Sequence, residues 1–97
     1  MSVPKKEIFI VKLRSIKSTV EKASDTQKKE HIAIHLGESF NSLISEIAQE
    51  YPDLKDSLPK PFTSTGMFRR LEKMEVNYLD LEIETETVLS LLNLVEK

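Results

Sequence analysis

Residues 25–51 read DTQKKEHIAIHLGESFNSLISEIAQEY and carry a long, regular apolar pattern. Its apolar members recur at steps of three and four, and they are Ala33, Leu36, Phe40, Leu43, Ile44, Ile47 and Tyr51. This spacing predicts one stripe of an α-helix. Asp25 or Thr26 is expected to cap the helix, and Pro52 prevents its continuation. We therefore expect a central helix over 25–51, about 39 Å long, against which the other elements pack.

A first helix is predicted on the N-terminal side of this segment, from about Lys5 to Lys22. Its core-facing residues share one stripe, and they are Phe9, Leu13, Ile16 and Val20. Only Ala23 and Ser24 separate this helix from the central one, so the two are expected to run antiparallel.

The C-terminal segment is more ambiguous. Residues 79–86 alternate apolar and acidic residues, which is the period of a strand. They continue into 88–95 without a turn residue, and Asn77 can cap a helix whose first turns hold acidic residues. A lone strand would also need a partner, and no second strand is evident. We therefore predict a helix over about 77–96.

The only long irregular stretch is 52–66, which contains three of the four prolines. Residues 59–62 should be extended and form a strap that tucks Phe62 into the core. Gly37 lies inside the central helix, where a glycine is less favourable than alanine by about 1 kcal/mol. We expect either the close approach of another helix backbone there or a tolerated glycine without a role.

The fold class predicted is all-α, a single helical domain over 1–97. It consists of three main helices (about 5–22, 25–51 and 77–96) and one or two short ones. The chain has 97 residues, only two glycines and 6% aromatic residues, which disfavours a β-sandwich. It has no cysteine, which excludes disulfides and thiolate metal sites and fits a reducing compartment. No signal peptide or membrane-spanning run is evident. We expect a complete small cytoplasmic protein.

Charge is distributed unevenly along the chain, although the net charge is only −2. Residues 1–36 hold eight basic and four acidic residues, whereas residues 75–97 hold one basic and six acidic residues. The first and last helices should therefore attract each other within one fold or between two copies. The alternative is a basic face that binds an anionic partner.

The last predicted helix has two apolar stripes. The broader one faces the core, and it consists of Tyr78, Leu81, Thr85, Val88, Leu89, Leu92 and Val95. The narrower one holds Leu79, Ile83 and Leu94. A helix that is apolar on two sides packs between two neighbours. We predict that these three residues bind a partner, either a second copy or another protein. The alternative is that a short helix near Met67 or the proline strap covers them.

Sites for chemistry are sparse. His31, His35 and Glu38 would share one face of the predicted central helix, but that face is the solvent side, so we predict no metal site and no cofactor. No serine stands in a nucleophile-elbow context, and the two glycines are too isolated to cradle a phosphate. The chain is not expected to be an enzyme.

A short helix capped by Ser64 or Thr65 is predicted next. Its apolar side would hold Met67, Phe68, Leu71 and Met74, and its basic side Arg69, Arg70 and Lys73. The basic side is the only candidate for a nucleic-acid recognition element, with Lys28 and Lys29 as further contacts. Three cations would bind weakly and in a salt-sensitive way. The function expected first is a non-enzymatic interaction module that forms a homo-oligomer or acts as an adaptor. The alternative is a weak nucleic-acid-binding regulator.

Overall fold

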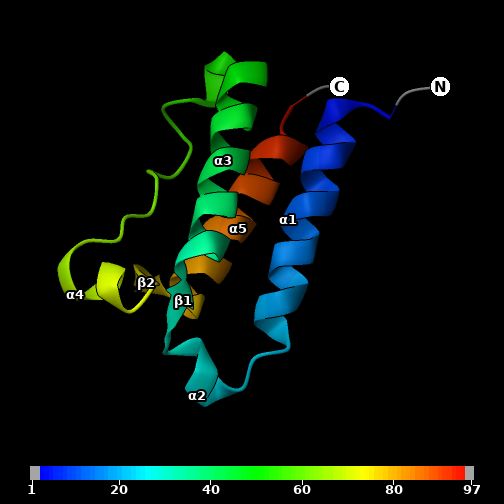
Figure 1. Cartoon of the computed structure of the whole chain (residues 1–97). Coiled ribbons are helices and arrows are strands. Elements are labelled where there is room, and N and C mark those ends of the chain that lie inside the picture. Colours follow the sequence, from blue (N-terminus) through cyan, green and yellow to red (C-terminus); the bar gives the residue numbers. More distant parts are fainter. Residues whose placement is uncertain (1–2, 96–97) are drawn as a thin grey trace.

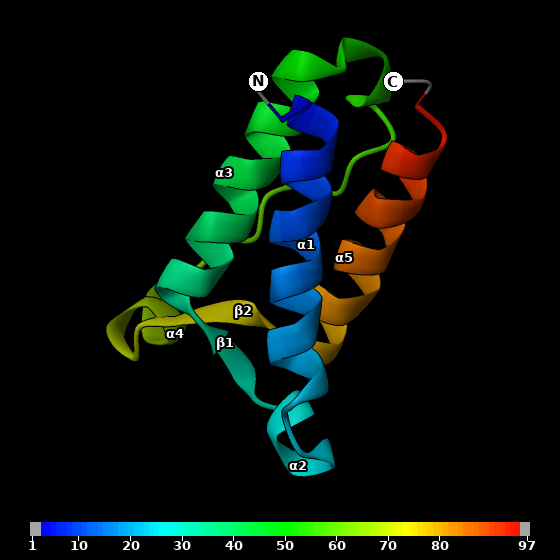
Figure 2. The same cartoon turned by 90° about the vertical axis from the view of Figure 1, so that its right-hand side faces the viewer.

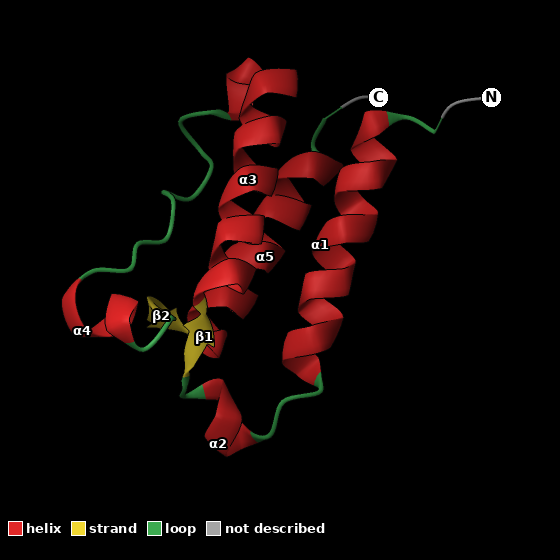
Figure 3. Cartoon of the chain, in the orientation of Figure 1, coloured by secondary structure: helices red, strands yellow, loops and turns green. Residues whose placement is uncertain are grey.

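Three long helices, α1 (Lys5–Glu21), α3 (Ile34–Glu50) and α5 (Tyr78–Asn93), form most of the molecule, which we describe from a computed structural model over residues 3–95. The short elements in the connections are α2 (Asp25–Lys28), β1 (His31–Ala33), η1 (Pro52–Leu54), α4 (Gly66–Arg70) and β2 (Lys73–Asn77). The predicted all-α class is therefore confirmed, with a small two-stranded sheet in addition (Figure 3). No helix within 3–95 is both long and apolar enough to cross a bilayer.

The long helices lie side by side, and α1 runs antiparallel to both α3 and α5 (Figures 1 and 2). Helix α1 packs closely on α5, where Lys17 Nζ lies 3.1 Å from a carboxylate oxygen of Glu86. The opposite charges of the first and last helices thus meet within one chain. Both side chains are partly exposed, so this ion pair contributes little to stability.

The core lies between the three helices and is closed by the strap and β2. From α1 it takes Phe9, Leu13 and Val20, as predicted, whereas Ile16 is only half-buried. The predicted stripe of α5 is also buried at four positions, namely Leu81, Thr85, Val88 and Leu92. Thr85 is the one polar member, and its hydroxyl donates to the Leu81 carbonyl one turn earlier at 2.6 Å.

The central helix over 25–51 was predicted too long at its N-terminal end. Ser24, rather than Asp25 or Thr26, caps α2 through a reciprocal pair of hydrogen bonds with Gln27. The helix then stops after Lys28, residues 31–33 are extended, and α3 begins at Ile34. The extended segment buries Ile32 completely between two half-buried neighbours. Pairing with a distant strand therefore outweighs the local helical pattern.

That partner is β2, which the sequence analysis missed. The two strands are antiparallel, with His31 opposite Asn77 and Ala33 opposite Lys73. Residues 73–77 had been divided between the predicted short helix and the start of the last helix. Helix α5 follows directly, capped by Asn77 and Asp80 in a reciprocal pair of hydrogen bonds. The prediction that 79–86 are helical is thereby confirmed.

Gly37 marks a close approach, but the neighbour is a side chain of β2 and not a helix backbone. A Cβ atom placed on Gly37 would collide with the Met74 side chain, which is 2% exposed. The glycine therefore makes room for Met74 against the first turn of α3.

The proline strap follows the prediction. Phe62 is buried, and its ring stacks on Phe40 with centroids 4.9 Å apart. The Asn41 side chain accepts from the Phe62 backbone N–H at 2.8 Å and donates to the Phe62 carbonyl at 2.9 Å. Asn41 thus holds the strap against α3 as a neighbouring strand would.

Candidate protein interface

The outward face of α5 lies opposite its buried stripe and exposes the three residues predicted to bind a partner. Leu79, Ile83 and Leu94 are 38%, 60% and 76% exposed. Neither the proline strap nor α4 covers Ile83, so the alternative of internal coverage does not hold for this residue. A contiguous patch of exposed apolar side chains is typical of an interaction site.

The three residues do not form one continuous patch. On the same face between Ile83 and Leu94 stand Glu86, Thr87 and Ser90, all of them exposed. Leu94 follows Ile83 by eleven positions, which corresponds to about 16 Å along the helix axis. Leu94 is also the C-terminal cap residue of α5 and not part of the helix itself. The structure therefore brings Leu79 and Ile83 together and leaves Leu94 apart.

A shallow hollow adjoins Ile83 at the corner between the strap, β2 and α5. It is lined by Phe62, Val76, Asp80, Ile83 and Glu84. Its walls come from three separate segments, and each segment is fixed locally. Asn41 holds the strap at Phe62, pairing with β1 holds β2, and the Asn77 cap sets the first turn of α5. We call these five lining residues the corner hollow.

The corner hollow combines an apolar floor with acidic residues at its edge. Phe62, Val76 and Ile83 supply the apolar surface, and Asp80 and Glu84 lie four residues apart on α5. Asp80 accepts from the Asn77 backbone N–H at 3.2 Å. Within residues 3–95 neither carboxylate forms an ion pair. The hollow therefore suits an apolar side chain that is flanked by cations.

Helix α4 is shorter than predicted and presents its apolar residues to solvent. Met67 and Leu71 are 69% and 61% exposed, whereas Phe68 is half-buried against the His31 ring, with centroids 4.7 Å apart. Met74, predicted to share this apolar side, instead lies in β2 and reaches the core. The prediction that these four residues share one side of a short helix was wrong, because the helix ends at Arg70 before its second full turn.

The predicted basic side is divided for the same reason. Arg69 and Arg70 close α4, whereas Lys73 belongs to β2 and pairs opposite Ala33. All three side chains are exposed, and none forms an ion pair with another described residue. Of the two further cations, Lys28 lies 3.9 Å from Glu82, and Lys29 is exposed just after α2. The five cations therefore do not form a recognition helix.

The histidines and Glu38 do not share one helix face, contrary to the prediction. His31 lies in β1, where its ring packs on Phe68 and its Nδ1 lies 3.0 Å from the Met74 carbonyl oxygen. His35 and Glu38 are exposed on the first turns of α3. Among the described residues, no three His, Cys, Asp or Glu side chains are arranged to hold a metal ion. His31 has a structural role between β1, β2 and α4.

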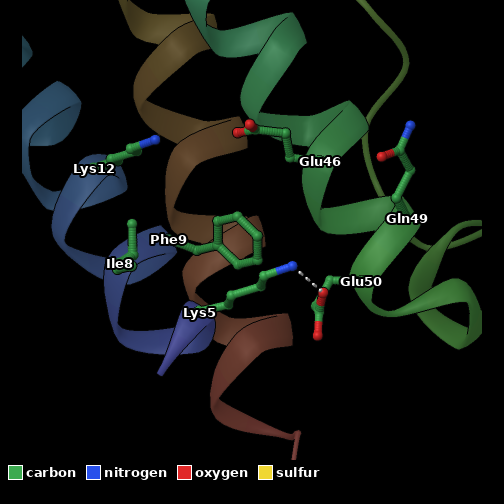
Figure 4. A pocket seen from close by; sticks show the side chains of 7 residues that line it. All are labelled: Lys5, Ile8, Phe9, Lys12, Glu46, Gln49 and Glu50. Carbon is green, nitrogen blue, oxygen red and sulfur yellow. Dashed lines mark hydrogen bonds and ion pairs between the residues drawn. The ribbon is translucent and has the colours of Figure 1, made fainter. Parts of the chain in front are cut away.

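A second hollow lies between α1 and α3, near the N-terminal end of α1 (Figure 4). The Phe9 ring points into it, and Lys5 Nζ lies 3.1 Å from a Glu50 carboxylate oxygen. Lys12 and Glu46 point toward each other farther along (Figure 4). Because cations and carboxylates face each other across it, this hollow has less unmet charge than the corner hollow. The sequence analysis did not identify it, because it depends on how α1 and α3 face each other.

Comparison with known proteins adds nothing to this description. No protein-family model matches the chain, and neither the curated proteins nor the solved structures contain a significant match. Function must therefore be inferred from the surface of the chain itself.

Proposed function

We propose that this protein is a non-enzymatic helical interaction module that self-associates through the outward face of α5, centred on Leu79 and Ile83. One observation carries the proposal. Ile83 is 60% exposed beside an apolar hollow, on the face of α5 opposite the core. Fully burying an isoleucine side chain is favourable by about 1.5–3 kcal/mol. A partner that covers Ile83 gains part of this free energy, because 60% of the side chain is still exposed in the monomer.

The acidic residues at this face fit binding better than catalysis. Acid–base catalysis by two carboxylates requires environments that separate their pKa values, usually through burial. Here Asp80 is exposed and already serves the N-terminal cap of α5. Glu84 is one turn farther along the helix at the edge of an open hollow. A cytoplasmic location is part of this proposal and can be checked by fractionating cells that express the protein.

The test is the molar mass in solution of Ile83→Glu, measured by light scattering on a sizing column over a range of concentrations. We expect the unchanged protein to be a dimer at high concentration, and Ile83→Glu to be a monomer with the same far-UV circular dichroism. The matched control is Val11→Glu, because Val11 is 66% exposed on α1. It should leave the dimer intact. A monomeric unchanged protein at every concentration overturns self-association, and a dimer in both variants overturns the assignment to α5.

The alternative function expected from the sequence was weak nucleic-acid binding by Arg69, Arg70 and Lys73. These residues are exposed but come from two elements and lack a helix long enough to enter a groove. The alternative predicts binding to a labelled oligonucleotide at low salt that falls steeply as salt rises. Fluorescence anisotropy without any change at low salt removes it.

A further inference from the structure

We propose that the corner hollow receives helix α4 of a second copy, so that each copy supplies both a basic helix and an acidic receptor. This inference rests on the proposed function, because it identifies the counter-surface for the outward face of α5. It rests on the complementary chemistry of helix α4 and the corner hollow, which are both exposed on the same chain.

Helix α4 has the composition that the hollow requires. Met67 lies in α4 and Leu71 is its C-terminal cap residue, whose backbone N–H donates to the Met67 carbonyl one turn earlier at 3.0 Å. Both side chains are more than half exposed. Arg69 and Arg70 lie between them in sequence. Within residues 3–95 Arg70 makes no side-chain hydrogen bond or ion pair, and Arg69 reaches only the Ser64 carbonyl at 3.5 Å. The helix therefore offers apolar side chains together with unmet positive charge.

The corner hollow offers the complementary groups, namely an apolar floor and two carboxylates. Its floor of Phe62, Val76 and Ile83 can receive an unbranched, adaptable side chain such as Met67. The carboxylates of Asp80 and Glu84 can accept hydrogen bonds from arginine, whose planar fork matches a carboxylate. The strength of such charge pairs rises as water is excluded around them.

Within one chain, helix α4 does not reach the corner hollow. No residue of α4 lines the corner hollow. Helix α4 projects sideways from the helices at one end of the molecule, and β2 leads from it to the start of α5 (Figures 1 and 2). The five residues of β2 span about 16 Å. The basic helix and the acidic hollow are thus held apart on neighbouring parts of one chain.

A two-fold symmetric dimer would bring these two surfaces together. In such a dimer the same surface is used twice, so residue i meets residue j and j meets i. Helix α4 of each copy would lie against the corner hollow of the other, and the exposed Leu79 and Ile83 would be covered together with Met67 and Leu71. The dimer would then contain two identical contacts, which together cover four otherwise exposed apolar side chains on each chain.

The experiment is charge reversal with mixing, read out as the dissociation constant from light scattering or sedimentation. Arg69→Glu/Arg70→Glu and Glu84→Arg should each weaken the homodimer about tenfold or more, because the first sets glutamates against Asp80 and Glu84 and the second sets an arginine against Arg69 and Arg70 at both contacts. An equimolar mixture of the two variants should dimerise again, since one contact of the mixed dimer keeps the natural charges and the other sets the introduced glutamates against the introduced arginine. Lys12→Glu/Lys55→Glu makes the same change in net charge as the arginine variant but lies away from α4, and it should dimerise normally.

Three results distinguish this inference from the proposed function. A monomeric unchanged protein overturns both. A dimer that Ile83→Glu breaks but Arg69→Glu/Arg70→Glu does not change leaves the proposed function standing and overturns the pairing with α4. Loss of dimerisation in both charge variants without recovery in their mixture also overturns the pairing, provided that circular dichroism shows both variants folded.

Discussion

The two faces of helix α5 differ sharply, although both carry leucine or isoleucine. On the inward face Leu81, Val88 and Leu92 are completely buried, and on the outward face Leu79 and Ile83 are 38% and 60% exposed. Both faces arise from the same 16-residue helix and the same N-terminal cap. The inward face therefore determines the stability of the monomer, and the outward face is available for a partner.

The largest expected effect on stability comes from a substitution on the inward face of α5. Leu81→Ala should lower the free energy of unfolding by about 2–5 kcal/mol, because it removes buried methyl groups and leaves a cavity among packed helices. Urea denaturation measures the loss. Leu94→Ala is the matched control, since it makes the same chemical change at a site that is 76% exposed. Equal losses in the two variants would contradict the division of the helix into two faces.

The strap is expected to have an intermediate effect, since it supports both the core and the corner hollow. Asn41→Ala leaves the backbone N–H and carbonyl of Phe62 without their partner, at a cost of about 1–3 kcal/mol. It should also weaken dimerisation, because Phe62 forms one wall of the hollow. Ser45→Ala, on an exposed position of α3, should change neither quantity. An unchanged urea midpoint in Asn41→Ala would show that the strap does not depend on this side chain.

Removing the N-terminal cap of α5, on which both faces depend, should have a smaller effect on the free energy of unfolding. Asn77→Ala removes the side-chain acceptor for the Asp80 backbone N–H and should destabilise the protein by about 1 kcal/mol. The first turn of α5 should then fray, which amide hydrogen exchange at residues 78–81 detects. Protection factors equal to those of the unchanged protein would mean that the connection to β2 alone holds this turn.

The smallest expected effect on the monomer is on the outward face. Ile83→Ala should alter the free energy of unfolding by no more than about 0.5 kcal/mol when it is measured at concentrations below dimerisation. The same substitution should weaken the dimer measurably. A loss as large as that of Leu81→Ala at low concentration would place Ile83 in the core of the monomer.

Much of the fold follows from local pattern. The buried positions of α1 and the inward face of α5 were predicted because helical spacing reports which side of a helix faces a core. Asn77 was the residue that resolved the alternating segment 79–86, since its cap favours a helix over a strand. These predictions needed no knowledge of distant contacts.

The small sheet was missed because it depends on a distant contact. His31 pairs opposite Asn77, which is far away in the sequence, and nothing in residues 31–33 alone distinguishes a strand from the start of a helix. The prediction of the central helix joined three elements because Ala33, which lies in β1, happens to continue the helical spacing of α3. The pairing of β1 with β2 and the burial of Ile32 in the core override that spacing.

The candidate interface was predicted in part. Helical spacing placed Leu79, Ile83 and Leu94 on one outward face. It did not reveal that polar residues interrupt this face between Ile83 and Leu94. The corner hollow could not be predicted, because Phe62 and Val76 reach it only through the path of the strap and β2. The structure was likewise needed to show that Arg69 and Arg70 form no ion pair within residues 3–95.

The most direct test of the central claim uses the absence of cysteine from this chain. Thr87→Cys introduces a single thiol on the outward face of α5, one turn from Ile83, and Ser18→Cys introduces one at an exposed position on α1. The rate of alkylation by iodoacetamide is measured for both variants from low to high protein concentration. We predict that the rate falls for Thr87→Cys as the dimer forms and stays constant for Ser18→Cys. A constant rate for Thr87→Cys in a sample that light scattering shows to be dimeric would contradict the claim that α5 forms the interface.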